Sequence, residues 1–338
     1  MITQLEPPSR LHKFLLFCAI SCALLLSACS ESTSPDKTKS QAAQQPTLQT
    51  NQNKPKSIAL VMKTLTNPFF IEMERGARLA EKELGISLLV KTAAQETSIQ
   101  QQISIVDELI RMKVDAIVIA PGDSIELIPV LKQAQDEGII VINIDNRLDP
   151  EYSKLTGLSN VPFISVDNKR AAYFSAKTLA DKIKEPSSVA IIEGIRRASN
   201  AQERKNGAIA AFDEQPLANI VAMETANWKI DEAFEVSKQI FNKHSDIKAL
   251  FCANDMMALG AIKYLQSTGR NDVLVAGFDA LEQAKSAIRA GKLVATVDQQ
   301  AAEQGYQGIL FAHRALAAEK LPKLMYIDTK ILTIENIN

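Results

Sequence analysis

From residue 57 onward, short apolar runs alternate with longer segments whose apolar residues recur about every 3.6 positions. Residues 58–62 form one such run, and Ile99, Ile103, Val106 and Ile110 mark one face of a helical segment. Continuous apolar strands separated by helices indicate parallel sheets that are covered on both faces. The pattern therefore predicts an α/β fold of the doubly wound type.

A division into two domains is expected because a single sheet with so many strands would be unusual. A break near Asn160 and Pro162 separates two similar series of elements, so we expect two similar α/β domains. The expected strands cover residues 58–63, 87–92, 116–120, 139–144, 163–166, 189–193, 220–224, 249–253, 273–277 and 295–297, followed by a last helix over 301–319 and a final strand-like segment over 325–333.

The amino end has the features of an export signal rather than of a folded domain. Basic residues precede an apolar run over residues 14–26, which is too short to span a membrane as a helix. The run ends in Leu-Ser-Ala-Cys at residues 26–29, which resembles a bacterial lipoprotein cleavage site. The resemblance implies a signal peptide over residues 1–28 and a lipid on Cys29. Ordinary secretion with cleavage near Ala28 is the alternative.

Residues 29–56 are rich in Ser, Thr, Gln, Lys and Pro and have almost no apolar content, so they cannot form a core. We expect a flexible tether that holds the exported domain to a membrane surface through the lipid on Cys29. Of the four cysteines, only Cys252 lies beyond the tether, and a single thiol forms no internal disulfide. Cys252 ends an apolar run and is expected to be an inert core residue.

Composition and motifs weigh against several classes of function. The net charge of −1 argues against a broad nucleic-acid-binding surface. The motifs G-x-S-x-G, G-x-x-x-x-G-K-[ST], G-x-G-x-x-G and H-E-x-x-H are absent, as is an acidic calcium-binding loop. Beyond the signal, His244 and His313 each stand alone in helical regions, which favours surface or packing roles. We therefore expect no enzyme, no metal site and no cofactor.

Polar side chains follow the expected strands at their carboxyl ends, where open α/β sheets bind ligands. Amide and carboxylate groups at such an edge can bridge the adjacent hydroxyls of a sugar. Each residue alone has another explanation, since Asn and Asp favour turns and helix caps, and Asp255 is interpreted as only a cap. Their recurrence in both halves of the chain favours a binding site. The residues are Asn67, Asp145, Asn146, Asn254, Asp279 and Gln299.

Two phenylalanines and the single tryptophan are the aromatic candidates for this site. Asn67 is a good N-cap, and Pro68 suits the start of a helix whose apolar stripe includes Phe70 but not Phe69. One stripe cannot bury both rings, so Phe69 is the stronger candidate for stacking on the C–H face of a sugar. Trp228 follows a strand and precedes a helix, and core and site roles are equally open for it.

Several segments together resemble the periplasmic ribose-binding proteins. The resemblance extends from about residue 57 to the end of the chain and implies the type 1 periplasmic binding protein fold. That fold consists of two Rossmann-like, doubly wound parallel-sheet lobes joined by a three-segment hinge. The segments are residues 64–70, 254–261 and 277–279, while residues 63–65, 191–194 and 252–255 are closer still to the allose-binding members.

The family organisation implies that each lobe is built from separate parts of the chain. The amino-terminal lobe is expected to consist of residues 57–166 plus 300–328, and the carboxyl-terminal lobe of residues 167–299 plus 329–338. The crossing segments are expected near residues 166–168, 298–300 and 328–330.

Carried over position by position, the resemblance also implies a ligand pocket between the lobes. Lys63 corresponds to a lysine that is typical of the allose type. Ribose binders have an arginine directly after the aspartate, whereas here Asn146 follows and Arg147 comes one residue later, which leaves the identity of the sugar open. The implied ligand-binding residues are Lys63, Asn67, Phe69, Phe70, Asp145, Asn146, Arg204, Trp228, Asn254, Asp279 and Gln299.

The charges of this expected pocket favour a neutral ligand. Lys63 and Arg204 oppose Asp145 and Asp279, two against two. A phosphorylated ligand would lie close to both carboxylates, and like charges repel each other. We therefore expect a neutral monosaccharide or polyol.

The sequence thus predicts the substrate-binding lipoprotein of an ABC-type sugar importer, exported and anchored at the cell envelope, whose two lobes close on the ligand. Its partners would be the ABC permease subunits, the membrane through the lipid on Cys29, and in some cases a chemoreceptor. The alternative is a receptor subunit that senses a sugar or a furanosyl autoinducer for a membrane kinase or chemoreceptor. A sugar-responsive repressor shares the same clamp but needs an amino-terminal helix-turn-helix where this chain has its export signal.

Overall fold

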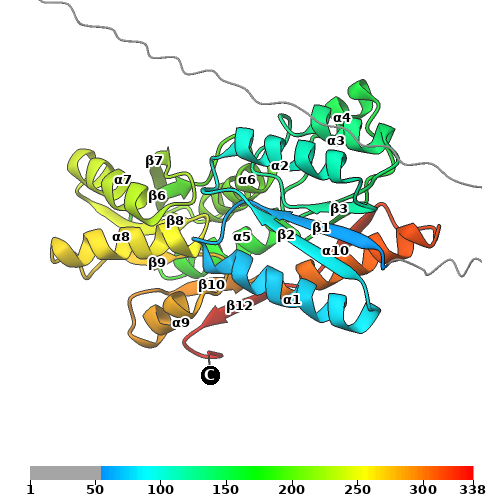
Figure 1. Ribbon diagram of the computed structural model, residues 1–338. Helices are drawn as coiled ribbons and strands as arrows, with labels where there is room; N and C mark the ends of the chain where they lie inside the picture. Colours follow the sequence, from blue (N-terminus) through cyan, green and yellow to red (C-terminus); the bar gives the residue numbers. More distant parts are fainter. Residues whose placement is uncertain (1–54, 338) are drawn as a thin grey trace, which may run out of the picture. The chain divides into compact units, whose positions relative to one another are not determined.

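The computed structural model describes residues 55–337, which form two six-stranded sheets with helices packed on their faces (Figure 1). The predicted α/β architecture with two largely parallel sheets is confirmed. The predicted signal peptide, Cys29 and nearly all of the predicted tether lie outside the described residues.

The first sheet is entirely parallel and has the strand order β11-β5-β4-β3-β1-β2. With its helices it forms what we call the amino lobe. Its strands are β1 (Ser57–Met62), β2 (Ser87–Thr92), β3 (Ala116–Ile119), β4 (Ile140–Ile144), β5 (Phe163–Ser165) and β11 (Leu324–Tyr326). Its helices are α1 (Pro68–Leu84), α2 (Ile99–Met112), α3 (Ile128–Asp136), α4 (Pro150–Thr156) and α10 (Ala301–Leu316).

The second sheet has the order β12-β10-β9-β8-β6-β7 and is parallel except that β12 pairs antiparallel with β10. With its helices it forms the carboxyl lobe. Its strands are β6 (Ser187–Glu193), β7 (Ala218–Thr225), β8 (Ile247–Cys252), β9 (Leu274–Ala276), β10 (Ala295–Asp298) and β12 (Lys330–Thr333). Its helices are α5 (Asn168–Ala180), α6 (Ser199–Asp213), α7 (Ile230–Lys243), α8 (Asp255–Ser267) and α9 (Glu282–Arg289).

Strand β1 shows why a strand in a sheet covered on both faces has a continuous apolar sequence. Ile58, Leu60 and Met62 point into the apolar core that includes α1, whereas Ala59 and Val61 point into a second core formed with α2 and α3. All five side chains are fully buried, so a strand of this kind is apolar at every position.

The chain passes between the two sheets three times. It leaves the amino lobe after β5 and enters α5, where the Ser175 hydroxyl donates to the Gly277 carbonyl of the carboxyl lobe at 2.9 Å. It returns after β10 into α10, which packs along α1, and crosses again between β11 and β12. These crossings confirm the three-segment connection expected of the fold.

The single strand-like segment expected over residues 325–333 is wrong in detail. The structure has two short strands there, and they belong to different sheets: β11 pairs with β5, and β12 pairs with β10. Each strand completes the edge of one lobe, and the residues between them make the third crossing. Asp328 and Thr329 interrupt the apolar pattern between the two strands, at the crossing that the family organisation implied near residues 328–330.

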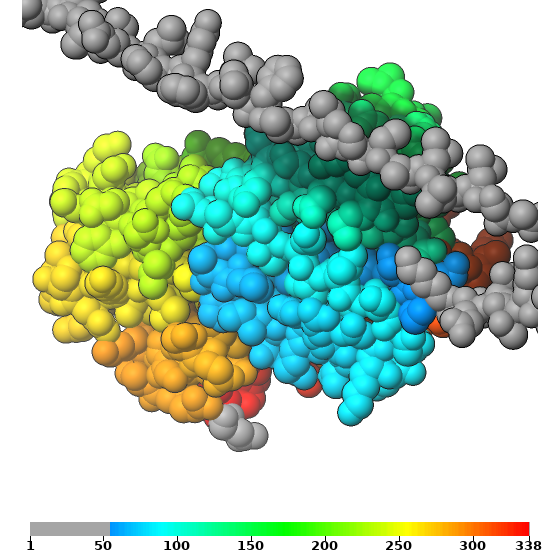
Figure 2. Space-filling model, viewed as in Figure 1, coloured from blue at the N-terminus to red at the C-terminus, as the bar shows by residue number. Residues whose placement is uncertain are grey.

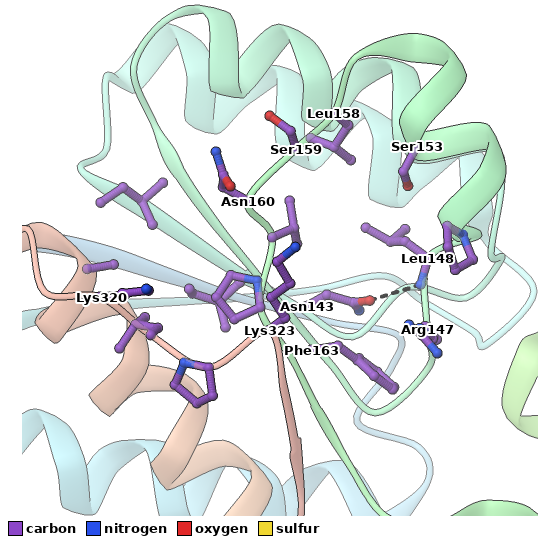
Figure 3. Close-up of a pocket in the computed structure, with 18 of the residues that line it drawn as sticks. Asn143, Arg147, Leu148, Ser153, Leu158, Ser159, Asn160, Phe163, Lys320 and Lys323 are labelled. Carbon is purple, nitrogen blue, oxygen red and sulfur yellow. Dashed lines mark hydrogen bonds between the residues drawn. The ribbon is translucent and has the colours of Figure 1, made fainter.

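Two large cavities occupy equivalent places in the two lobes. The amino-lobe cavity has a volume of about 690 Å³ and lies among β4, β5 and the segment after α10 (Figure 3). Asn143 lines it and accepts a hydrogen bond from the Leu148 amide at 2.9 Å. The carboxyl-lobe cavity of about 610 Å³ lies among β9, the segment between α9 and β10, and the end of β12. Because both occur beside the sixth strand of their sheet, they reflect the repeated architecture of the lobes.

Helices α1 and α10 approach each other closely because glycines lie at their contact. A Cβ atom at Gly76 would lie 1.7 Å from the backbone oxygen of Ala302, and one at Gly305 would lie 2.0 Å from the backbone oxygen of Met73. No real Cβ atom comes this close to another atom, so any larger residue would push the helices apart.

We expect Gly305→Ala to lower the free energy of unfolding by about 1–3 kcal/mol, since the added methyl group overpacks a tight contact. Lys82→Ala, at an exposed position of α1, is the control and should change it by less than about 0.5 kcal/mol. Urea unfolding followed by circular dichroism measures both, and equal midpoints for the two variants would contradict the close approach of the helices.

Candidate binding site between the lobes

The carboxyl ends of strands from both sheets meet around an enclosed chamber with a cavity volume of about 20 Å³. On the face shown in Figure 2, the blue and cyan residues of the amino lobe abut the yellow-green and yellow residues of the carboxyl lobe. The chamber is lined by Lys63, Asn67, Phe69, Phe70, Glu96, Asp145, Asn200, Arg204, Trp228, Asn254, Asp279 and Gln299.

The structure brings together every residue of the predicted set except Asn146. Three of them directly follow a strand, as the sequence suggested: Lys63 follows β1, Asp145 follows β4, and Gln299 follows β10. Asn254 and Asp279 come shortly after the ends of β8 and β9. Arg204 instead reaches the chamber from α6. The topology therefore gathers residues that are as much as 236 positions apart in the chain, from Lys63 to Gln299 (299 − 63 = 236).

The backbone is strained where it turns into the chamber. Asp145, Trp228 and Asp279 have positive φ angles of 63°, 68° and 122°, a region that non-glycine residues rarely adopt. Such strain persists only where the surroundings over-determine it, and it concentrates at functional sites. Here it turns a carboxylate, an indole and a second carboxylate toward one space.

On the amino-lobe side, a buried ion pair joins the ends of β1 and β4. Lys63 Nζ lies 2.7 Å from Asp145 Oδ2, and both side chains are 3% exposed. Lys63 Nζ also lies 5.5 Å from the centre of the Phe70 ring. A lysine buried this deeply needs a carboxylate partner, so the pair fixes the position of both groups.

Phe69 and Phe70 are both buried, contrary to the expectation that the helix could bury only one of them. Their rings meet edge to face with centroids 5.0 Å apart. Phe69 packs in the same apolar core as Phe70 and Met73 and also lines the chamber. Asn67 caps the helix as predicted, because its Oδ1 accepts from the Phe69 amide at 3.1 Å.

On the carboxyl-lobe side, the Arg204 guanidinium is held by acceptors from several elements. Nε donates to Asn168 Oδ1 at 2.8 Å, and Nη1 donates to the Ala253 carbonyl at 3.0 Å. Nη1 and Nη2 also reach Asp279 Oδ1 and Gln299 Oε1 at 3.5 and 3.4 Å. The Phe278 ring stacks below, 3.8 Å from the guanidinium carbon, so the fork has one orientation.

Burial shifts the pKa values of both partners of this pair. It lowers the pKa of Arg204, against the attraction of Asp279, and raises the pKa of Asp279 well above its usual value, against the attraction of Arg204. Gln299 Nε2 donates to Asp279 Oδ1 at 2.6 Å and supports the charged carboxylate. The pair is therefore a connected polar network rather than an isolated contact.

Two further residues of the chamber, Glu96 and Asn200, were not predicted from the sequence. Glu96 lies four residues beyond the end of β2, so it is not a strand-end residue, although the loop that carries it begins at the same edge of the sheet. Asn200 is the second residue of α6, whose N-cap position is the apolar Ala198. The Ser199-Asn200 pair at the start of α6 was the available sequence signal for Asn200.

Asn146 does not line the chamber but links the lobes beside it. It is fully buried, and its Nδ2 donates to the Pro121 carbonyl at 3.1 Å. Its Oδ1 accepts from the Asn200 amide of the carboxyl lobe at 3.2 Å. The next residue, Arg147, points into the amino-lobe cavity and stacks on Phe163, 5.6 Å from the ring centre (Figure 3).

In the described part of the chain, four buried side-chain atoms have no hydrogen-bond partner, and three belong to chamber residues. Asp145 Oδ2 nevertheless contacts Lys63 as an ion pair. This leaves one acceptor, Asn200 Oδ1, and one donor, Trp228 Nε1, without a partner at the chamber. Leaving such groups unpaired costs about 1–3 kcal/mol each, so the chamber is suited to a ligand that carries both donors and acceptors.

A family model described as a periplasmic binding protein domain matches residues 58–320. A D-ribose/D-allose-binding protein of Pseudomonas aeruginosa is 41% identical over 265 residues, which cover 78% of this chain and 82% of that protein. The chain belongs to the periplasmic binding protein family.

Two further relatives of this periplasmic binding protein are also sugar-binding proteins by their names. The D-allose-binding periplasmic protein of Escherichia coli is 30% identical over 283 residues, which cover 81% of this chain and 91% of that protein. A solved ABC transporter solute-binding protein from Actinobacillus succinogenes, with bound D-allose, is 37% identical with a TM-score of 0.78 and covers 83% and 98% of the two chains. The resemblance to the ribose- and allose-type members is confirmed.

Over residues 55–337 of this periplasmic binding protein, no cluster of three or more His, Cys, Asp or Glu is arranged to hold a metal ion. The helices of that same range include none with the length and apolar character needed to cross a bilayer.

Asp255 is not the helix cap that the sequence suggested. Asn254 caps α8 through its Oδ1, which accepts from the Met257 amide at 2.9 Å. Asp255 is fully buried and accepts from Thr296 Oγ1 at 2.7 Å and from the Leu281 amide at 2.9 Å, so it ties α8 to β10 and to the start of α9. Burial raises the pKa of Asp255 to about 7, against these hydrogen bonds.

The raised pKa of Asp255 predicts an unusual dependence of stability on pH. The folded state binds this proton more tightly than the unfolded state, so the contribution of Asp255 to stability falls as pH rises from about 4 to about 7. Relative to that of Asp255→Asn, the free energy of unfolding of the wild type should fall by up to about 1.4 kcal/mol per pH unit in that window. Urea unfolding between pH 4.5 and 8 measures the difference, with the exposed Asp181→Asn as control, and a difference independent of pH would contradict the prediction.

Proposed function

We propose that this chain is the sugar-binding component of an ABC-type importer and captures one neutral monosaccharide or polyol in the chamber. The observation that carries the proposal is the pairing of an unpartnered acceptor, Asn200 Oδ1, with an unpartnered donor, Trp228 Nε1, in a chamber that also contains aromatic rings. A sugar hydroxyl is both donor and acceptor, and the C–H face of a sugar packs against aromatic rings.

The size and charge of the chamber narrow the class of ligand. The chamber has a cavity volume of only about 20 Å³, so its ligand has to be small and the lobes have to part to admit it. Lys63 and Arg204 are already neutralised by Asp145 and Asp279, and Glu96 adds a third carboxylate. A phosphate or carboxylate ligand would face this excess of acidic groups, so a neutral ligand is favoured.

The relatives support the same class of ligand. Their names and bound ligands include D-ribose and D-allose, and the myo-inositol-binding protein of Caulobacter, 26% identical with a TM-score of 0.76, extends the class to a cyclic polyol. We propose that Lys63, whose ammonium group is fixed by Asp145, separates an allose-like ligand from ribose. The relatives of Bacillus subtilis and Escherichia coli named as ribose import binding proteins support import rather than sensing.

In the proposed mechanism, the ligand bridges amino-lobe groups to Arg204, Trp228, Asn254, Asp279 and Gln299 and thereby favours the closed form. A ligand shifts such an equilibrium only through contacts that it makes in that form alone. The ABC permease subunits would then recognise the closed protein. A signal peptide over residues 1–28 and a lipid on Cys29 would place it at the cell envelope.

Direct contacts between the lobes assist this closure. Arg197 of the carboxyl lobe lies 2.8 Å from both Asp123 and Glu126 of the amino lobe. The Ser199 amide donates to Ser124 Oγ at 2.9 Å beside this pair. Because Arg197 is 60% exposed, the ion pairs contribute only modestly, and they bias the closed form without occupying the chamber.

Titration calorimetry with pentoses, hexoses and inositols tests the proposed function on the purified full-length protein. We expect a dissociation constant of about 1 mM or below for at least one sugar or polyol. The absence of any such ligand from the panel would overturn the proposal.

Asp279→Ala should abolish measurable binding of the sugar that binds best, because it removes a chamber acceptor and leaves the buried Arg204 without its carboxylate. Thermal unfolding of the same sample checks that the variant is folded. If the folded Asp279→Ala protein bound the sugar with normal affinity, the chamber would not be the binding site.

Arg197→Ala should open the ligand-free protein and weaken sugar binding by up to about fivefold, since exposed ion pairs contribute at most about 1 kcal/mol. Small-angle X-ray scattering of the ligand-free protein reports the opening, and calorimetry reports the affinity. Arg75→Ala, which removes an exposed pair within α1, is the matched control. Identical scattering and affinity in the two variants would count against a contribution of Arg197 to closure.

A further inference from the structure

Glu96 is a charged chamber residue without an ion-pair partner among the described residues, unlike Lys63, Asp145, Arg204 and Asp279. Lys63 pairs with Asp145, and Arg204 pairs with Asp279. Within residues 55–337, no cation lies within ion-pair distance of Glu96, although its side chain is nearly buried, at 7% exposure. A carboxylate that is buried without a cation is costly, and such groups concentrate where a site requires them.

Asn67 determines how Glu96 is held. The Oδ1 atom of Asn67 is committed to the start of α1, where it accepts from the Phe69 amide at 3.1 Å. The amide nitrogen of Asn67 must therefore point the other way, and it donates to Glu96 Oε1 at 2.9 Å. The helix cap thus fixes the orientation of the amide, and the amide fixes one oxygen of Glu96.

The second carboxylate oxygen of Glu96 accepts no hydrogen bond from the described residues, although the side chain lines the chamber. We propose that Glu96 is a selectivity-determining residue whose Oε2 accepts a hydrogen bond from one particular hydroxyl of the ligand. This inference rests on the proposed sugar-binding function and deepens it. A sugar that lacks or inverts that hydroxyl would leave the carboxylate without a partner, and a site built to bind a hydroxyl rejects such an analogue strongly.

The surroundings of Glu96 make this contact sensitive to pH. Burial raises the pKa of Glu96 to about 7, against the attraction of Lys63 and the hydrogen bond from Asn67. The charged groups that face it are Lys63 after β1, Asp145 after β4, Arg204 on α6 and Asp279 after β9. Below this pKa the carboxylate is protonated and becomes a weaker acceptor, so the contact is strongest above pH 7 and weakens as pH falls.

The test compares wild type with Glu96→Gln, which keeps the shape of the side chain and an oxygen that can accept from Asn67. At pH 8 we expect the variant to bind the best sugar of the panel at least about tenfold more weakly, as expected for the loss of a hydrogen bond to a charged group. Between pH 8 and pH 5.5 the affinity of wild type should fall relative to that of the variant, in which position 96 does not titrate. Glu72→Gln, at an exposed position of α1, is the control and should match wild type at every pH.

Monodeoxy derivatives of the same sugar identify the hydroxyl. In wild type at pH 8, removal of the hydroxyl that bonds Glu96 should cost at least about tenfold in affinity, whereas in Glu96→Gln the same removal should cost little. Equal penalties for every derivative in both proteins would overturn the inference. The same comparison in wild type alone, at pH 8 and pH 5.5, gives an answer even if the variant is poorly folded, because the penalty at one position should shrink at the lower pH.

The outcomes separate this inference from the proposed function. If wild type binds no sugar, the proposed function fails. If wild type binds sugar and Glu96→Gln has the same affinity and the same pH profile, the function stands and the role of Glu96 is refuted.

Discussion

The buried guanidinium of Arg204 is the constraint on which the chamber depends. A charge that is 3% exposed must be surrounded by acceptors, and its acceptors here come from the start of α5, the ends of β8 and β9, and the residue after β10. The cost of removing this charge from water is offset only if all of these elements are in place. The arginine therefore links the carboxyl ends of three strands to one another, and Asp279 and Gln299 owe their positions to it as much as to their own turns.

The amino lobe also contains a buried cation at the chamber, the ammonium group of Lys63. Lys63 and Asp145 form one short contact, and the positive φ of Asp145 turns its carboxylate toward the lysine. A single ammonium group donates to fewer fixed partners than a guanidinium, so this side of the chamber is held by fewer contacts. Polar atoms that a ligand can satisfy lie on both lobes: Glu96 Oε2 on the amino lobe, and Asn200 Oδ1 and Trp228 Nε1 on the carboxyl lobe.

Much of the fold and site could be predicted because parallel strands place their carboxyl ends at one edge. Several chamber residues follow apolar runs, so they can be found by locating the ends of the expected strands. They are Asn67, Asp145, Asn254, Asp279 and Gln299. The features that could not be predicted depend on contacts between elements that are distant in the sequence. Asp255 bonds to Thr296 and Leu281, which lie more than 25 residues away in the chain. Glu96 lies inside a loop, and Asn146 turns away from the chamber to contact Pro121 and the backbone of Asn200.

The three crossings between the sheets have a consequence for how such a chain is assembled. The amino lobe needs α10 and β11, which come after the entire series from α5 to β10. When the chain emerges from a ribosome or a translocation pore, the first five strands therefore appear long before the helix and the edge strand that complete their sheet. Neither lobe is a contiguous fragment, so no single cut can release one of them whole, and the final segment from α10 to β12 contains parts of both lobes.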